Sequence, residues 1–244
     1  MIETHTYKEK IRQSGHCIIE NVFDTIEIND LRASITGSID RIAKNLLIPY
    51  EMSYPEASFN ERLELAAQKD PSYTNAIITS LYADGHLAEP INGIYNHKKI
   101  QSLVQELILP HPNQKPTIRI RVSLCSQLDK LQPWHSDVVN PAKTGCGSNK
   151  LTCWIPLQDI NPENGSLEII NKSFDEPFTH QINSGQFAIS ENQLSNFPTS
   201  TIECKAGDVV FLDRFTPHRS LKNLTSSVRW SIVLWIKGFD ENEN

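Results

Sequence analysis

The chain has 244 residues, of which 39% are hydrophobic and 21% are charged, and these proportions predict a globular protein and exclude a disordered one. The net charge of -6 argues against nucleic-acid binding, which requires a basic face, but it leaves room for a small anionic ligand at a locally positive site. Five cysteines without CxxC spacing favour reduced thiols and a cytoplasmic location, and we expect neither a signal peptide nor a membrane-spanning segment.

The first half of the chain has the apolar spacing of helices. Apolar residues three and four positions apart predict a long helix with one buried stripe. The members of this stripe are Ile28, Leu31, Ile35, Ile39, Ile42 and Leu46. Shorter helical patterns follow around residues 61–68, 73–82 and 98–107.

The second half changes to the period of strands. Apolar and polar residues alternate from Thr117 to Leu124, which predicts a half-buried strand. Further strands are expected at residues 151–157, 166–170, 208–213 and 228–237. Short strands after a helical half predict an α+β fold with a mainly β core, in which N-terminal helices buttress an antiparallel barrel or jelly roll. We expect a single domain over residues 1–244, helix-rich in 1–115 and with its β core mainly in 116–238.

Two histidines and an aspartate are the strongest indication of chemistry in the chain. His135 and Asp137 stand two residues apart in Trp-His-Ser-Asp, so in an extended segment both side chains point to one face. His218 follows much later, after the expected strand at 208–213. Two imidazoles and one carboxylate can form the facial triad of a non-haem Fe(II) site, which leaves adjacent coordination positions open.

The last expected strand carries an unusual polar pair. Arg229 and Ser231 share a face with Val233 and Trp235, which is typical of the floor of a pocket. The planar guanidinium of arginine can grip a carboxylate with two hydrogen bonds, and the serine hydroxyl can add a third. The alternative is an arginine exposed on an edge strand.

These segments together resemble the phytanoyl-CoA dioxygenase family of Fe(II)- and 2-oxoglutarate-dependent oxygenases. The resemblance covers nearly the whole chain, and it is carried by residues 7–23, Trp134 to Asp137, Thr152 to Leu167, and Gly207 through His218 to Arg229. It implies a double-stranded β-helix, the cupin-like form of the jelly roll. One departure is residues 171–174, Asn-Lys-Ser-Phe, where many relatives have Pro-Gly-Ser-His. With the polar stretch 175–198, this predicts a reshaped substrate rim.

The resemblance also implies roles for particular residues. His135, Asp137 and His218 would be the catalytic Fe(II) ligands. Arg229 and Ser231 would bind the distal carboxylate of the co-substrate 2-oxoglutarate. Thr152 and Trp154 share a face of their strand and are candidates for lining the co-substrate pocket, although Trp154 suits the core equally well.

The expected function is oxidation of an unactivated C–H bond of a small molecule by dioxygen, with release of succinate and CO2. A carboxylate at Asp137 favours hydroxylation or a related oxidation, because halogenases of this superfamily leave that position vacant for halide. Epimerisation, desaturation and cyclisation at the same site stay open. Two further classes of protein, a cupin-like binding module without turnover and a zinc hydrolase, could use the same three ligands, but neither explains the Arg-x-Ser strand.

Substrate contacts are expected mainly from loops and from one strand. Arg119 and Arg121 are candidates for binding an anionic substrate or the near carboxylate of 2-oxoglutarate. The alternative is that both lie on the solvated face of the strand. The segment 138–150, with Gly145 and Gly147 as flexible points, is a candidate lid.

Overall fold

The computed structural model describes residues 2–83, 87–107, 116–127, 131–138, 149–183 and 185–238. In the first half, the described residues form one strand and otherwise helices: α1 (Ile2–Ser14), β1 (His16–Ile19), α2 (Thr25–Asn45), α3 (Tyr50–Ser53), α4 (Arg62–Lys69), α5 (Pro71–Tyr82), η2 (Ile94–Asn96) and α6 (Lys98–Leu107). The second half contains β2 (Thr117–Ser123), β3 (Asn149–Pro156), β4 (Leu167–Ile170), β5 (His180–Asn183), β6 (Gln186–Ile189), α8 (Glu191–Leu194), β7 (Thr199–Thr201), β8 (Val209–Asp213), β9 (His218–Ser220) and β10 (Arg229–Gly238).

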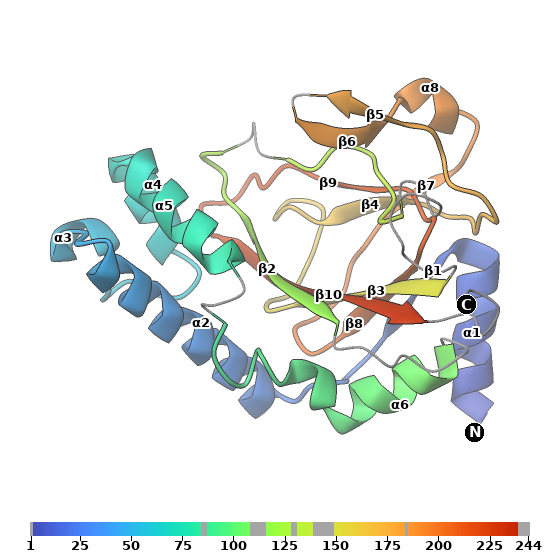
Figure 1. The fold of residues 1–244 in the computed structure, drawn as a ribbon, viewed down its shortest axis with the longest axis horizontal. Helices are drawn as coiled ribbons and strands as arrows, with labels where there is room; N and C mark the ends of the chain where they lie inside the picture. Colours follow the sequence, from blue (N-terminus) through green and yellow to red (C-terminus); the bar gives the residue numbers. More distant parts are fainter. Residues whose placement is uncertain are drawn as a thin grey trace, which may run out of the picture.

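Two antiparallel sheets face each other and form the jelly roll (Figure 1). The larger sheet has the strand order β1-β8-β3-β10-β2, and the smaller has the order β7-β4-β9. The strands β5 and β6 form a separate hairpin beyond the smaller sheet. Helices ahead of a mainly antiparallel β core confirm the predicted α+β fold class and its jelly-roll core.

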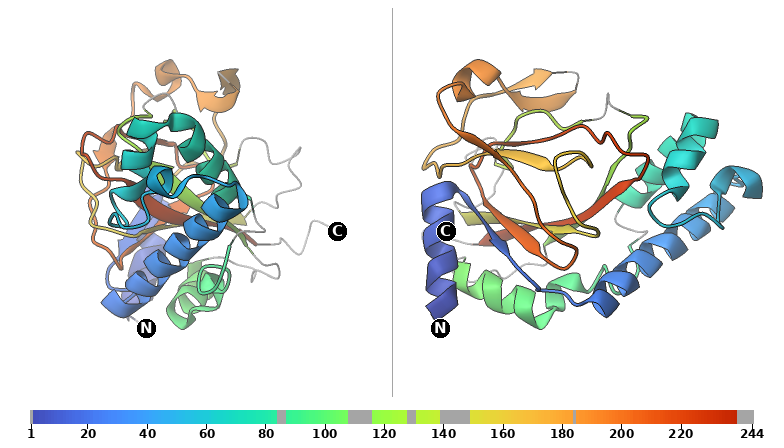
Figure 2. Two further views of the ribbon diagram at one scale, coloured as in Figure 1. Left: turned by 90° about the vertical axis from the view of Figure 1, so that its left-hand side faces the viewer. Right: turned by 180° about the vertical axis from the view of Figure 1, so that it is seen from behind.

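The long helix α2 lies against the outer face of the larger sheet, together with α1 and α6 (Figures 1 and 2). It begins with a capping box, in which the Asp24 side chain accepts from the Glu27 N–H and the Glu27 side chain accepts from the Asp24 N–H. Five of the six residues of its apolar stripe are buried, with Ile35 fully enclosed, whereas Leu46 is 45% exposed because the helix ends at Asn45 and Leu46 is its C-cap. The principal core of the protein therefore lies between this sheet and the helices.

The strand β10 divides its side chains between this core and the interior of the jelly roll. Trp230, Ile232, Leu234 and Ile236 belong to the core beneath the helices. Because side chains alternate along a strand, Arg229, Ser231, Val233 and Trp235 face the other way, towards the smaller sheet. The register pairs Ser231 with Arg121 and Val233 with Trp154, so the inner faces of β2 and β3 lie beside that of β10.

The stretch 175–198, expected only to be long and polar, forms the β5–β6 hairpin and α8. A small aromatic cluster holds it to the rest of the molecule. Its members are Trp134, Ile170, Phe174, Phe178, Ile189, Leu194 and Phe197.

Four of the cysteines, Cys17, Cys125, Cys153 and Cys204, are unpaired thiols. Within the described ranges, no helix combines the length and the apolar character needed to cross a bilayer.

Candidate metal centre and its cavity

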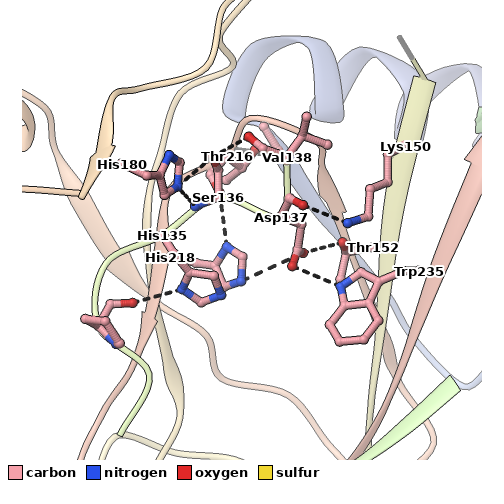
Figure 3. Close-up of polar contacts among 12 residues, drawn as sticks. His135, Ser136, Asp137, Val138, Lys150, Thr152, His180, Thr216, His218 and Trp235 are labelled. Atoms are coloured by element: carbon pink, nitrogen blue, oxygen red, sulfur yellow. Dashed lines mark hydrogen bonds and ion pairs between the residues drawn. The ribbon is translucent and has the colours of Figure 1, made fainter. Parts of the chain in front are cut away.

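His135, Asp137 and His218 come together inside the jelly roll, and one potential ligand atom from each lies within 4.8 Å of the others (Figure 3). The two histidines belong to an antiparallel bridge. The N–H of His135 donates to the carbonyl of His218 at 3.0 Å, and the reverse bond measures 2.9 Å. Backbone hydrogen bonds thus fix the separation of two residues that are remote in sequence.

Each imidazole is oriented by a hydrogen bond on its Nδ1 side. His135 Nδ1 lies 2.8 Å from the carbonyl of Pro133, and His218 Nδ1 lies 3.0 Å from the carbonyl of Thr216. Since a carbonyl only accepts, each Nδ1 must carry the proton, which leaves the Nε2 lone pair free for a metal. Burial, followed by the neighbouring charge of His218, lowers the pKa of His135 to about 4. His135 is therefore neutral at pH 7, as a ligand must be.

Both oxygens of the Asp137 carboxylate are held by side chains of the larger sheet (Figure 3). Oδ1 accepts from Trp235 Nε1 at 2.9 Å, and Oδ2 accepts from the hydroxyl of Thr152. Burial alone would raise the pKa of Asp137, but the neighbouring charges of His218 and Lys150 contribute to holding it below its ordinary value. The carboxylate is therefore ionised, and the three side chains fit the donor set of a divalent iron site.

A cavity of about 410 Å³ opens beside these three residues, which is within the range of small-molecule sites. Its wall on the sheet side includes Thr152, Trp154, Arg121 and Arg229. The helix α5 closes another side with Asn75, Ile78, Thr79 and Tyr82.

Arg229 is a buried cation without a carboxylate partner among the described residues, and its side chain is only 3% exposed. Nε donates to the carbonyl of Gly165 at 2.9 Å, and Nη1 donates to Ser231 Oγ at 3.0 Å. Burial lowers the pKa of Arg229 to about 10, so the guanidinium keeps its proton at neutral pH. Because an uncompensated buried charge is unfavourable, this position fits an anionic ligand such as a carboxylate.

Most of the residues expected from the sequence meet at this cavity. Its lining includes His135, Asp137, His218, Thr152, Trp154, Arg229 and Arg121. Ser231 is absent from that lining and instead supports Arg229. Arg119 does not line the cavity either, and its Nη1 donates to the carbonyl of Ile118 at 3.0 Å. The expected lid at 138–150 falls almost entirely on residues 139–148, which lie outside the described residues.

Several residues that line the cavity are not marked by any motif in the sequence. Ser123, Gln132 and Gln186 line the cavity, and each has a buried side-chain oxygen without a hydrogen-bond partner in the described structure. The alternation that places Arg121 on the inner face of β2 also places Ser123 there, so strand periodicity alone could have indicated it. Gln132 and Gln186 reach the cavity only through the tertiary fold.

Comparison with known proteins gives a family and a fold. The family model described as Phytanoyl-CoA dioxygenase (PhyH) matches residues 11–231. No curated protein matches the sequence.

Solved structures match over nearly the whole chain. The epimerase SnoN, in complex with Fe3+, alpha ketoglutarate and nogalamycin RO, is 17% identical with a TM-score of 0.59, and the match covers 97% of this chain and 84% of SnoN. The carbocyclase SnoK from nogalamycin biosynthesis is 18% identical with a TM-score of 0.54, covering 95% and 83%. EctD from S. alaskensis, with 2-oxoglutarate and 5-hydroxyectoine, is 14% identical with a TM-score of 0.60, covering 95% and 74%. At these identities the likeness shows a shared fold.

Proposed function

Since the chain belongs to the phytanoyl-CoA dioxygenase family, we propose that it oxidises a C–H bond of a small molecule with dioxygen, Fe(II) and 2-oxoglutarate. The co-products of this reaction are succinate and CO2. One observation carries the proposal: the His135, Asp137 and His218 group shares a cavity with the buried guanidinium of Arg229, which has no carboxylate partner among the described residues. The three ligand side chains fit a metal ion, and the guanidinium fits an anion.

Different residues of the cavity would bind the metal and the co-substrate. His135, Asp137 and His218 would hold Fe(II), and Arg229 would hold the distal carboxylate of 2-oxoglutarate with Ser231 fixing the guanidinium. The Trp154 ring, 5.8 Å from the Arg229 guanidinium carbon, would form the wall beside the co-substrate. Bound together, Fe(II) and 2-oxoglutarate supply the activation of dioxygen. The protein supplies position and the exclusion of water.

Hydroxylation is the primary outcome that we propose, and the ionised carboxylate of Asp137 favours hydroxylation or a related oxidation over halogenation. Epimerisation or ring closure at the same site is the second candidate, favoured by the fold shared with the epimerase SnoN and the carbocyclase SnoK. A metal-binding module without turnover, or a zinc hydrolase, would have no use for the buried cation at Arg229.

The test is anaerobic titration of 2-oxoglutarate into the Fe(II)-loaded protein, monitored by the visible metal-to-ligand charge-transfer band. We expect the band in the wild type and its loss in His135→Ala. Arg229→Gln should weaken 2-oxoglutarate binding by about thirtyfold or more, because a buried charge pair would lose one member. The matched control is Arg119→Gln, which removes an arginine that does not line the cavity.

A protein that binds Fe(II) but never develops the band with 2-oxoglutarate would rule out the co-substrate assignment. A zinc hydrolase or a binding module would then be the better explanation of the site.

A further inference from the structure

Arg121 is a second cation on the wall of the cavity, distinct from Arg229. It lies on β2 opposite Ser231. Its guanidinium carbon lies 5.4 Å from the centre of the Trp235 ring and 5.8 Å from that of Tyr82. No carboxylate among the described residues forms an ion pair with it, and the two rings beside it, those of Trp235 and Tyr82, are uncharged.

The position of Arg121 relates it to the metal centre. Trp235, over which the guanidinium lies, is the residue that donates to Asp137 Oδ1. Arg121 lines the same cavity as His135 and Arg229. Two like charges in one cavity are unfavourable unless each receives an anion. The distal carboxylate of 2-oxoglutarate would compensate Arg229 and leave Arg121 without a counter-ion.

The rest of the wall offers hydrogen bonds in addition to apolar surface. Gln132 and Gln186 each have a buried amide oxygen without a partner in the described structure. Gln127 and Asn75 also line the cavity and bond to each other at 2.9 Å. A long acyl chain would leave the amide oxygens of Gln132 and Gln186 without a partner, whereas a polar molecule could donate to them.

We propose that Arg121 binds a carboxylate of the primary substrate, and that this substrate is a small polar acid. The proposal rests on the proposed function, because the cavity would be shared with 2-oxoglutarate. The carboxylate bound by Arg121 has a second possible source, because the carboxylate of 2-oxoglutarate that lies beside the metal could also reach this residue. An experiment must therefore separate a substrate carboxylate from one that belongs to the co-substrate.

Acetate labelled with 13C at the carboxylate serves as the probe, and acetamide labelled at the carbonyl is its uncharged match. Mn(II) replaces Fe(II), because it accepts similar ligands and speeds the relaxation of nearby nuclei. Relaxation of each probe is measured with the metal-loaded protein, before and after saturation with 2-oxoglutarate. The proteins are the wild type, Arg121→Gln and, as the matched control from the same strand face, Arg119→Gln.

We expect metal-dependent relaxation of acetate that persists with 2-oxoglutarate bound and is absent for acetamide. Arg121→Gln should weaken acetate binding by about tenfold, as for loss of a charged hydrogen bond, and Arg119→Gln should leave it unchanged. Loss of the acetate effect on addition of 2-oxoglutarate would assign Arg121 to the co-substrate and overturn the proposal. Equal acetate binding in wild type and Arg121→Gln, or no acetate binding at all, would also overturn it. Failure of the proposed function is recognised separately, by the missing charge-transfer band with Fe(II).

Discussion

Each oxygen of the Asp137 carboxylate is fixed by a side chain from a different strand, Thr152 on β3 and Trp235 on β10. Removing the hydroxyl while keeping the shape, as in Thr152→Val, leaves Oδ2 free to turn away from the position that a metal requires. We expect about tenfold weaker binding of Fe(II), measured by anaerobic metal titration. The control is Thr199→Val, an exposed threonine of β7. Equal metal affinity in both variants would show that Thr152 does not orient the carboxylate.

At the level of single residues, the sequence predicts those that have an unmistakable chemical type. Few amino-acid types bind iron, so His135, Asp137 and His218 could be picked out of the sequence as candidate ligands. The structure brings these three residues together. It is harder to predict which residues on one face of a strand reach a cavity. Arg119 and Arg121 share one face of β2, yet only Arg121 reaches the cavity wall, because the shape of the cavity is set by tertiary packing.

At the level of elements, His180 joins the β5–β6 hairpin to the segment that contains the candidate metal ligands His135 and Asp137. The Nε2 of His180 accepts from the N–H of Ser136, between these two residues, at 3.0 Å, and its Nδ1 donates to the carbonyl of Phe178 at 2.9 Å. The bond from Ser136 requires a neutral ring, because a protonated Nε2 cannot accept, whereas Nδ1 can donate to Phe178 in either state. The hairpin is thus held in place by an interaction that acid disrupts.

This arrangement predicts lower stability in acid. Burial lowers the pKa of His180 in the folded protein, and the hydrogen bond from Nδ1 to the carbonyl of Phe178, which the charged ring can also form, only partly opposes the shift. The unfolded chain then binds more protons, so stability is full above about pH 6.5 and falls as the pH drops through that value. Urea unfolding of the metal-free protein should show this between about pH 7.5 and pH 5.5.

His180→Gln should reduce that loss of stability but not abolish it. Burial also lowers the pKa values of His16 and His135, which account for the remaining loss. An identical pH dependence in the wild type and His180→Gln would contradict the role given to His180.

The helix and strand patterns of the sequence located most elements. The apolar stripe beginning at Ile28 corresponds to α2, and the strands expected at 208–213 and 228–237 correspond to β8 and β10 within one residue at each end. The β5–β6 hairpin was missed for a physical reason. Ile182 and Phe187 are 75% and 55% exposed, so its apolar residues do not follow the alternation of a strand that covers a core.

At the level of the whole molecule, the helices and the larger sheet enclose the principal core, and Ile35 of α2 is fully buried in it. Ile35→Ala should lower the free energy of unfolding by about 2–5 kcal/mol, because it leaves a cavity there. The melting temperature should fall by about 2–4 °C per kcal/mol, measured by calorimetry. The control is Ile26→Ala, since Ile26 is 71% exposed on the same helix. Equal effects of the two substitutions would contradict the packing of α2.

The strand order was beyond what local patterns can predict. His16 of β1 pairs with Leu212 of β8, and no periodicity connects segments so distant in the chain. The jelly roll was predicted from strand spacing and from family resemblance, and the structure supports that prediction. That residues 1–244 form a single domain stays a prediction.

The two faces of β10 have a consequence for errors in assembly. Its outer face is apolar and its inner face carries Arg229 and Ser231, so a slip of one residue would exchange the two sets. The slipped strand would press a guanidinium and a hydroxyl against the helices and expose Trp230 and Ile232 to the cavity. A chain in which β10 has slipped therefore has both a defective cavity and a destabilised core. Cellular quality control that recognises exposed apolar surface would remove such a chain, whether or not it has catalytic activity.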